Sequence, residues 1–160
     1  MNPPLDAETR WGLAVASGVA YFGIVFSFGF LLGVVRVTLI VRRVGTRAAE
    51  LAEAPIMLLV TVLAALFVAR RFLSPVSIRT RLLTGLTALS LLILAELGTV
   101  VLLQRQTLSG YLASRDPVSG SVYIVLLSLF AVMPAILASH LGVRIVQLLG
   151  LTIGWSGRER

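Results

Sequence analysis

The sequence predicts an all-α integral membrane protein, a bundle of four transmembrane helices followed by an interfacial helix. Three observations predict this class. Hydrophobic residues make up 58% of the chain and charged residues only 13%, whereas soluble domains carry about 25% charged residues. The mean hydropathy is +0.97. Four apolar stretches also approach or exceed the roughly 20 residues that cross a bilayer as a helix. With 160 residues, the chain is expected to form a single membrane domain, 1–160.

The first predicted span covers residues 12–41. Its apolar run is longer than a bilayer requires, so the helix must tilt or extend beyond the hydrocarbon. The run also exceeds the apolar region of a signal peptide, about 7–15 residues, which indicates a retained helix. Trp11 suits the membrane interface at its start, and Gly45 suits the stop of the helix. A short helical linker, 46–54, is expected to follow.

The second and third spans are predicted at 55–72 and 81–103. Pro55 suits the first turn of a helix, where the missing N–H has no intrahelical acceptor to lose. The interior of the third span holds one charged residue, Glu96.

The fourth span is predicted at 118–139. Before it, Asp116 suits the N-cap position and Pro117 the first turn. Pro134 lies inside the span and is expected to bend it, because the carbonyl of Phe130 loses its N–H partner.

The last segment, 140–153, is predicted to be an amphipathic helix in the membrane interface. His140, Arg144 and Gln147 recur at helical spacing on an otherwise apolar stretch. The alternative is that the fourth helix simply continues beyond the membrane.

Arginine is the only strongly basic residue of the chain, and its distribution predicts the orientation. With four spans, eight arginines share a side with the termini, and five lie on the other side. The eight are Arg10, Arg70, Arg71, Arg79, Arg81, Arg144, Arg158 and Arg160; the five are Arg42, Arg43, Arg47, Arg105 and Arg115. The positive-inside rule therefore favours cytoplasmic termini in a bacterial inner membrane.

Composition also excludes several classes of function. The chain has no cysteine and one histidine, so cysteine-ligated and histidine-rich metal sites are excluded. We expect no metal and no cofactor. The arginines lie at the ends of apolar stretches rather than in one patch, which argues against nucleic-acid binding. No nucleophile, phosphate-binding loop or catalytic triad is recognisable, so the sequence predicts no enzyme.

Arg36 and Glu96 are the candidates for a polar site, because each lies within an apolar run. Arg36 precedes Arg42 by 6 residues, and Glu96 precedes Gln104 by 8. At about 1.5 Å per residue, both lie roughly 10 Å from the same membrane surface. We therefore predict that they pair across the first and third helices. Two acids on the same side, Glu50 and Glu53, are competing partners for Arg36.

Two interpretations of this cluster stay open. The pair either fixes the register of the helices or forms a polar cavity that binds or gates a solute. A second pattern, Gly29 and Gly33, has the GxxxG spacing of close helix crossings. It predicts packing of the first helix against a neighbour within the bundle, with a homodimer interface as the alternative.

Three segments of the sequence carry a resemblance. They are GFLLGVVR at 29–36, AELAEAPIM at 49–57 and RDPVSG at 115–120. They resemble segments in a group of short hypothetical bacterial membrane proteins, and the likeness covers most of the chain up to the fourth helix. The resemblance implies a bacterial inner-membrane protein and carries no activity over.

Three hypotheses for function follow. The first is a structural or accessory protein that acts by helix packing in the lipid bilayer, with itself or with a membrane-protein partner. The second is a small transporter or channel that uses Arg36 and Glu96. The third is an enzyme acting on lipid-linked substrates, with Glu50, Glu53 and Asp116 at one surface.

Overall fold

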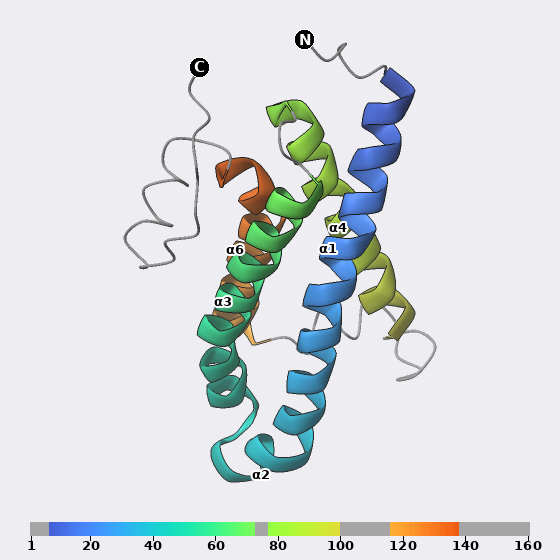
Figure 1. Ribbon diagram of the computed structural model, residues 1–160. Helices are drawn as coiled ribbons and strands as arrows, with labels where there is room; N and C mark the ends of the chain where they lie inside the picture. The colour runs from blue at the N-terminus through green and yellow to red at the C-terminus, as the bar shows by residue number, and fades with distance from the viewer. Residues whose placement is uncertain (1–6, 73–76, 100–115, 138–160) are drawn as a thin grey trace.

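The computed structural model describes residues 7–72, 77–99 and 116–137, and these ranges contain helices and no strand (Figure 1). The elements are α1 (Ala7–Val35), the π-helix η1 (Arg36–Ile40), α2 (Val41–Val44), α3 (Thr46–Phe72), α4 (Ile78–Gly98) and α6 (Pro117–Ile136). Four helical runs are long and apolar enough to cross a membrane: Glu8–Val44, Thr46–Phe72, Ile78–Gly98 and Pro117–Ile136. The predicted all-α class with four such helices is confirmed.

The four long helices form a square bundle. α1 packs on α3 and α4, and α6 packs on the same two helices, so α1 and α6 lie diagonally opposite each other. α1 begins and α6 ends at one end of the bundle, and the turn from α2 into α3 lies at the other end (Figure 1). We call the first the terminal end and the second the Gly45 end.

The buried core lies toward the terminal end. It combines two aromatic rings with small and medium side chains: Tyr21, Val25, Ala64, Ala65, Val68, Ala88, Phe130 and Met133. The alanines let the backbones approach, and close packing rather than a hydrophobic gradient holds helices together in lipid. This half of the bundle is therefore filled by side chains.

Two close helix crossings lie at glycines. A Cβ on Gly18 of α1 would lie 2.8 Å from Cβ of Thr87 of α4. A Cβ on Gly85 of α4 would overlap the carbonyl oxygen of Ala131 of α6. By contrast, a Cβ on Gly33 would meet nothing within 4 Å, and one on Gly29 would meet only the flexible end of Met57, at 3.3 Å. The predicted role of Gly33 in packing within the bundle is therefore not what the structure shows.

A buried hydrogen bond joins α1 to α6 at the carbonyl of Phe130, which Pro134 leaves without its N–H partner within α6. Pro134 has no N–H to donate to the carbonyl of Phe130. The hydroxyl of Tyr21 donates to that carbonyl at 3.2 Å, and the rings of Tyr21 and Phe130 stack with centroids 4.5 Å apart. The carbonyl that the proline leaves free is thus satisfied by another helix.

The helix ends follow local chemistry. Gly45 has φ 79°, which stops the first helical run as predicted, because glycine adopts this conformation without steric cost. Asp116 caps α6 as predicted, accepting from the N–H groups of Val118 and Ser119 at 3.0 Å each. Ser77 caps α4, accepting from the N–H of Thr80 at 3.4 Å.

The structure corrects the expected helix boundary at Pro55 and shows a π-helix within the first run. Residues 46–54 are not a separate linker, because α3 runs without interruption from Thr46 to Phe72 with Pro55 inside it. The first run contains the five-residue π-helix η1, which hydropathy does not reveal. Residues 100–103 and 138–139 of the predicted spans, and the predicted tail helix 140–153, lie outside the described residues.

Apolar side chains cover the outside of the bundle. Each long helix presents large apolar side chains that are more than half exposed: Leu31 62%, Leu59 56%, Leu94 65% and Ile124 64%. In water such a surface would be unfavourable. It suits contact with lipid acyl chains.

Candidate functional site

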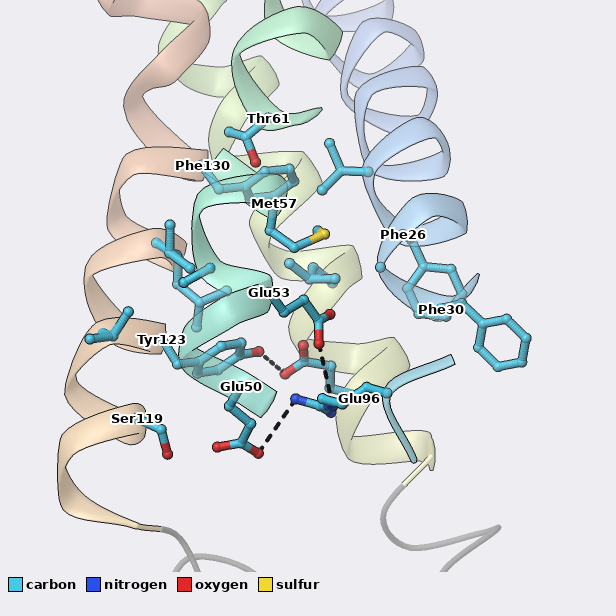
Figure 2. Close-up of a pocket in the computed structure, with 18 of the residues that line it drawn as sticks. Phe26, Phe30, Glu50, Glu53, Met57, Thr61, Glu96, Ser119, Tyr123 and Phe130 are labelled. Atoms are coloured by element: carbon cyan, nitrogen blue, oxygen red, sulfur yellow. Dashed lines mark hydrogen bonds and ion pairs between the residues drawn. The ribbon is translucent and has the colours of Figure 1, made fainter. Parts of the chain in front are cut away.

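A cavity of about 320 Å³ occupies the half of the bundle nearer the Gly45 end. All four long helices and η1 contribute to its wall (Figure 2). Ionisable and hydroxyl groups gather at one end of it: Arg36, Glu50, Glu53, Glu96, Thr99, Ser119 and Tyr123. The other end is largely apolar and is bounded by Phe130 of the core. All four residues predicted for a polar cluster line this one cavity.

Arg36 forms two ion pairs with α3. Its Nη1 lies 3.5 Å from Oε1 of Glu50, and its Nε lies 3.3 Å from Oε2 of Glu53. The two acids are three residues apart, which places them on one face of α3. The planar guanidinium presents donors in two directions and can contact both carboxylates at once. The three side chains are 28%, 19% and 16% exposed, so solvent still reaches this end of the cavity.

The π-helix begins at Arg36 itself. Within η1 the N–H of Val41 donates to the carbonyl of Arg36, which is one residue further along the chain than in an α-helix. The hydroxyl of Thr38 donates to the carbonyl of Val34 at 2.8 Å. This wider turn changes the direction of the residues that follow. π-turns of this kind are frequent at functional sites.

Glu96 makes its contact with a different helix. The hydroxyl of Tyr123, on α6, donates to Oε2 of Glu96 on α4. Figure 2 shows this pair beside the carboxylates of Glu50 and Glu53, with the polar ends of the side chains turned toward one another. The hydrogen bond therefore closes the α4–α6 side of the cavity, and the ion pairs of Arg36 close its α1–α3 side.

The arrangement differs from the predicted Arg36–Glu96 pair. The ion pairs of Arg36 are made with Glu50 and Glu53, the two acids that the sequence offered as competing partners. Arg36 and Glu96 line the same cavity, as their similar distances from the helix ends predicted. The rotation of each helix about its axis and the length of η1 decide which carboxylate the guanidinium reaches. Sequence reasoning did not single out Tyr123 as a site residue. The available signal was that Tyr123 follows the Asp116 cap within a helix, at a depth that Glu96 can share.

The apolar part of the cavity is lined by aliphatic, aromatic and thioether groups. They are Val25, Phe26, Met57, Leu92, Leu126, Leu127 and Phe130. Thr61, which is buried, adds one hydroxyl (Figure 2). Gly29 also belongs to the wall, where its missing side chain leaves room beside Met57. A cavity that is charged at one end and apolar at the other suits an amphiphilic molecule.

Ser119 lies in the wall at the polar end, on the first turn of α6. The residue is 4% exposed. Its hydroxyl lies near enough to the Asp116 carboxyl to help lower the pKa of that group, but its Oγ makes no hydrogen bond of ordinary geometry with the part of the chain that the structure describes. A buried hydroxyl without a partner carries an energetic cost unless something else satisfies it. The side chain extends from α6 toward the side on which Glu50 lies (Figure 2).

An ion pair at the Gly45 end connects the start of α3 to the start of α6. Nε of Arg47 lies 3.6 Å from Oδ1 of Asp116. The N–H of Ser119 lowers the pKa of the Asp116 carboxyl, and the N–H of Val118 and the charge of Arg47 lower it further. These contacts hold the ends of the two helices together next to the opening of the cavity.

The described residues contain no group of three or more histidine, cysteine, aspartate or glutamate side chains arranged to hold a metal ion. His140, the one histidine, lies outside them. Comparison of the chain with protein-family models, with curated proteins and with solved structures finds no match. The geometry of the cavity is therefore the basis for assigning a function.

Proposed function

We propose that this chain is a multi-pass protein of a bacterial inner membrane that binds a small solute in the cavity and transports it. The observation that carries the proposal is the cavity itself, in which ionisable groups from α3, α4 and η1 meet an apolar interior. Ionisable groups within membrane helices are costly and are usually retained for substrate or ion pathways. A purely structural ion pair would not require an open volume beside it.

The two halves of the bundle favour a transporter over a channel. The cavity lies in the half nearer the Gly45 end, and the core that includes Tyr21, Val68 and Phe130 fills the half nearer the terminal end. A channel needs a continuous path, whereas a transporter holds its solute in a cavity that is closed on one side at a time. The division of the bundle into a cavity and a filled half supports the proposal of a transporter.

The orientation assigns the cavity to one side of the membrane. The four-span topology predicted from the sequence assigns eight arginines to the side of the termini and five to the other, so we assign the terminal end to the cytoplasm. The polar end of the cavity then faces the periplasm. In this orientation the protein would receive a solute from the periplasmic side in the described conformation.

Transport is tested with the full chain reconstituted in liposomes. Uptake is measured for a cation, an anion and a zwitterion of similar size: benzyltrimethylammonium, phenylmethanesulfonate and phenylalanine. We expect uptake of at least one of them above that of empty liposomes, and a loss of about tenfold or more in Glu96→Gln, as removal of one charged contact predicts. The matched control is Glu8→Gln, because Glu8 lies in the first turn of α1, outside the cavity. Uptake equal to that of empty liposomes for all three probes would refute transport.

A role in helix packing is the second candidate, and one observation favours it. The surface beside Gly33 is open in this chain, and Phe30 nearby on the same helix is 60% exposed. This region of α1 therefore has room for a helix of a second copy or of another membrane protein. The natural chain has no cysteine, so Gly33→Cys gives a single reporter. Rapid disulfide-linked dimerisation in the membrane would support packing, and equally slow reaction of Gly33→Cys and Leu94→Cys would argue against it.

A further inference from the structure

We propose that the solute is a monovalent organic cation with an apolar body, such as a protonated or quaternary amine that carries an aromatic or aliphatic group. This inference rests on the proposed function, since it names the class of molecule that the same cavity would bind. It places the cationic head among Glu53, Glu96 and Ser119, and the apolar body against Met57 and Phe130.

The charges of the wall select against anions. Among the described residues that line the cavity are three carboxylates, Glu50, Glu53 and Glu96, and one guanidinium, Arg36. That guanidinium already contacts Glu50 and Glu53, so an incoming anion would have to compete with them for its donors. A cation would instead complement Glu50 and Glu53, two carboxylates that share this one guanidinium, in a region of low dielectric where unbalanced charge is unfavourable.

The hydrogen-bonding groups of the wall also suit a cationic head. Oε2 of Glu53 is buried and makes no hydrogen bond to the described residues, although Nε of Arg36 lies 3.3 Å away. The buried Oγ of Ser119 is likewise without a hydrogen bond to them. A protonated amine carries N–H donors for such acceptors, and a quaternary ammonium presents polarised C–H groups to them. This second observation is independent of the number of acids in the wall.

The remainder of the wall suits an apolar body rather than a bare ion. Leu92, Leu126 and Met57 provide aliphatic and thioether contacts. The ring of Tyr123, next to Glu96, provides an aromatic surface to which organic cations bind favourably, and the ring of Phe130 bounds the apolar end. The volume of about 320 Å³ falls within the range of roughly 300–1,000 Å³ that small-molecule sites occupy. A metal ion or a proton alone would leave most of this volume without contacts.

Binding is tested by calorimetry on the full chain in lipid nanodiscs, with three probes. Benzyltrimethylammonium carries the charge and the body, phenylmethanesulfonate carries a body of similar size with the opposite charge, and tetramethylammonium carries the charge alone. We expect benzyltrimethylammonium to bind at least about tenfold more tightly than either of the others, which corresponds to about 1.4 kcal/mol. This comparison uses the natural chain, so it does not depend on the folding of any variant.

Substitutions in the cavity wall then test whether the cation binds in the cavity. Glu53→Gln and Glu96→Gln are each expected to weaken binding of benzyltrimethylammonium by about tenfold or more, whereas Glu8→Gln leaves it unchanged. Binding of phenylmethanesulfonate as tight as that of the cation, or no binding of the cation, would overturn the assignment of the ligand class. If the anion both binds and is transported with loss in Glu96→Gln, the transport function stands and only the cation assignment fails. Equal binding of tetramethylammonium would overturn the role of the apolar wall.

Discussion

Single side chains of this protein satisfy polar groups that lie on other helices. Pro134 leaves the carbonyl of Phe130 without its N–H partner, and the hydroxyl of Tyr21 satisfies it from α1 at 3.2 Å. Arg36 likewise contacts two carboxylates of α3 that would otherwise lie unpaired in an apolar region. The sequence shows that a polar group requires a partner, because a proline or a charge within an apolar run is visible in it. It does not show which residue of another helix provides that partner.

The Tyr21–Pro134 relationship gives a prediction that a double-mutant cycle checks. Tyr21→Phe keeps the ring stacked on Phe130 and removes the donor, so we expect a loss of about 1–3 kcal/mol in the free energy of unfolding. In a Pro134→Ala background, the new N–H at residue 134 can donate to the carbonyl of Phe130. The cost of Tyr21→Phe should then fall by about 1 kcal/mol or more. An unchanged cost would show that the carbonyl does not depend on Tyr21. The measurement is reversible unfolding in mixed micelles.

At the scale of the element, the helices begin and end at residues whose chemistry is local. Gly45 stops the first helical run with φ 79°, and Asp116 and Ser77 cap α6 and α4. The differences from the predicted boundaries come from contacts with residues on other helices. α3 continues through Pro55 because its N-terminal part contacts α2 and supplies the acids that hold Arg36.

The continuity of α3 predicts a gain in stability from Pro55→Ala. An interior proline lacks the N–H for the carbonyl four residues earlier, so its replacement should raise the free energy of unfolding by about 1–3 kcal/mol. The matched control is Pro117→Ala, because Pro117 occupies the first turn of α6, where proline is favourable. We expect no gain there. Equal effects at the two positions in thermal unfolding would indicate that Pro55 instead begins a helix.

The Asp116 cap predicts a pH dependence of stability. Hydrogen bonds from the N–H groups of Ser119 and Val118, with Arg47 nearby, lower the pKa of this carboxyl in the folded chain. Its contribution to stability is therefore fully present above the pKa of the unfolded chain, about 3.9, and is lost as the pH falls through the folded pKa. Asp116→Asn keeps a capping oxygen without the charge. The midpoint of thermal unfolding should fall less between pH 5 and pH 3 in this variant than in the natural chain, and an identical fall would remove Asp116 as a contributor.

At the scale of the whole molecule, the bundle has a filled half and a hollow half. The core around Tyr21, Val68 and Phe130 fills the half toward the terminal end, and the cavity lies toward the Gly45 end. The close crossings at Gly18 and Gly85 hold α4 tightly to α1 and α6. Large exposed apolar side chains cover the exterior. Within the described residues, this division places the polar groups of the cavity toward the Gly45 end.

The topology predicts labelling from opposite sides of the membrane. The chain has no cysteine, so Ala48→Cys and Ile78→Cys each introduce a single thiol at an exposed position. Residue 48 lies at the Gly45 end and residue 78 near the terminal end. In intact cells we expect a membrane-impermeant maleimide to label position 48, and to label position 78 only after the membrane is permeabilised. The reverse pattern would invert the orientation and place the cavity opening in the cytoplasm.

The sequence by itself determined the helical class, the number of membrane-length helices, the Gly45 stop, the Asp116 cap and the presence of Arg36 and Glu96 in one polar cluster. These properties depend on composition and on spacing along one helix, which a linear pattern contains. Only the tertiary structure decided that Arg36 pairs with Glu50 and Glu53, that Glu96 accepts from Tyr123, and that Gly85 rather than Gly33 forms a close crossing. Those choices depend on how far each helix is rotated about its axis. The added residue of η1 and the packing of four helices together set that rotation, and no single segment encodes it.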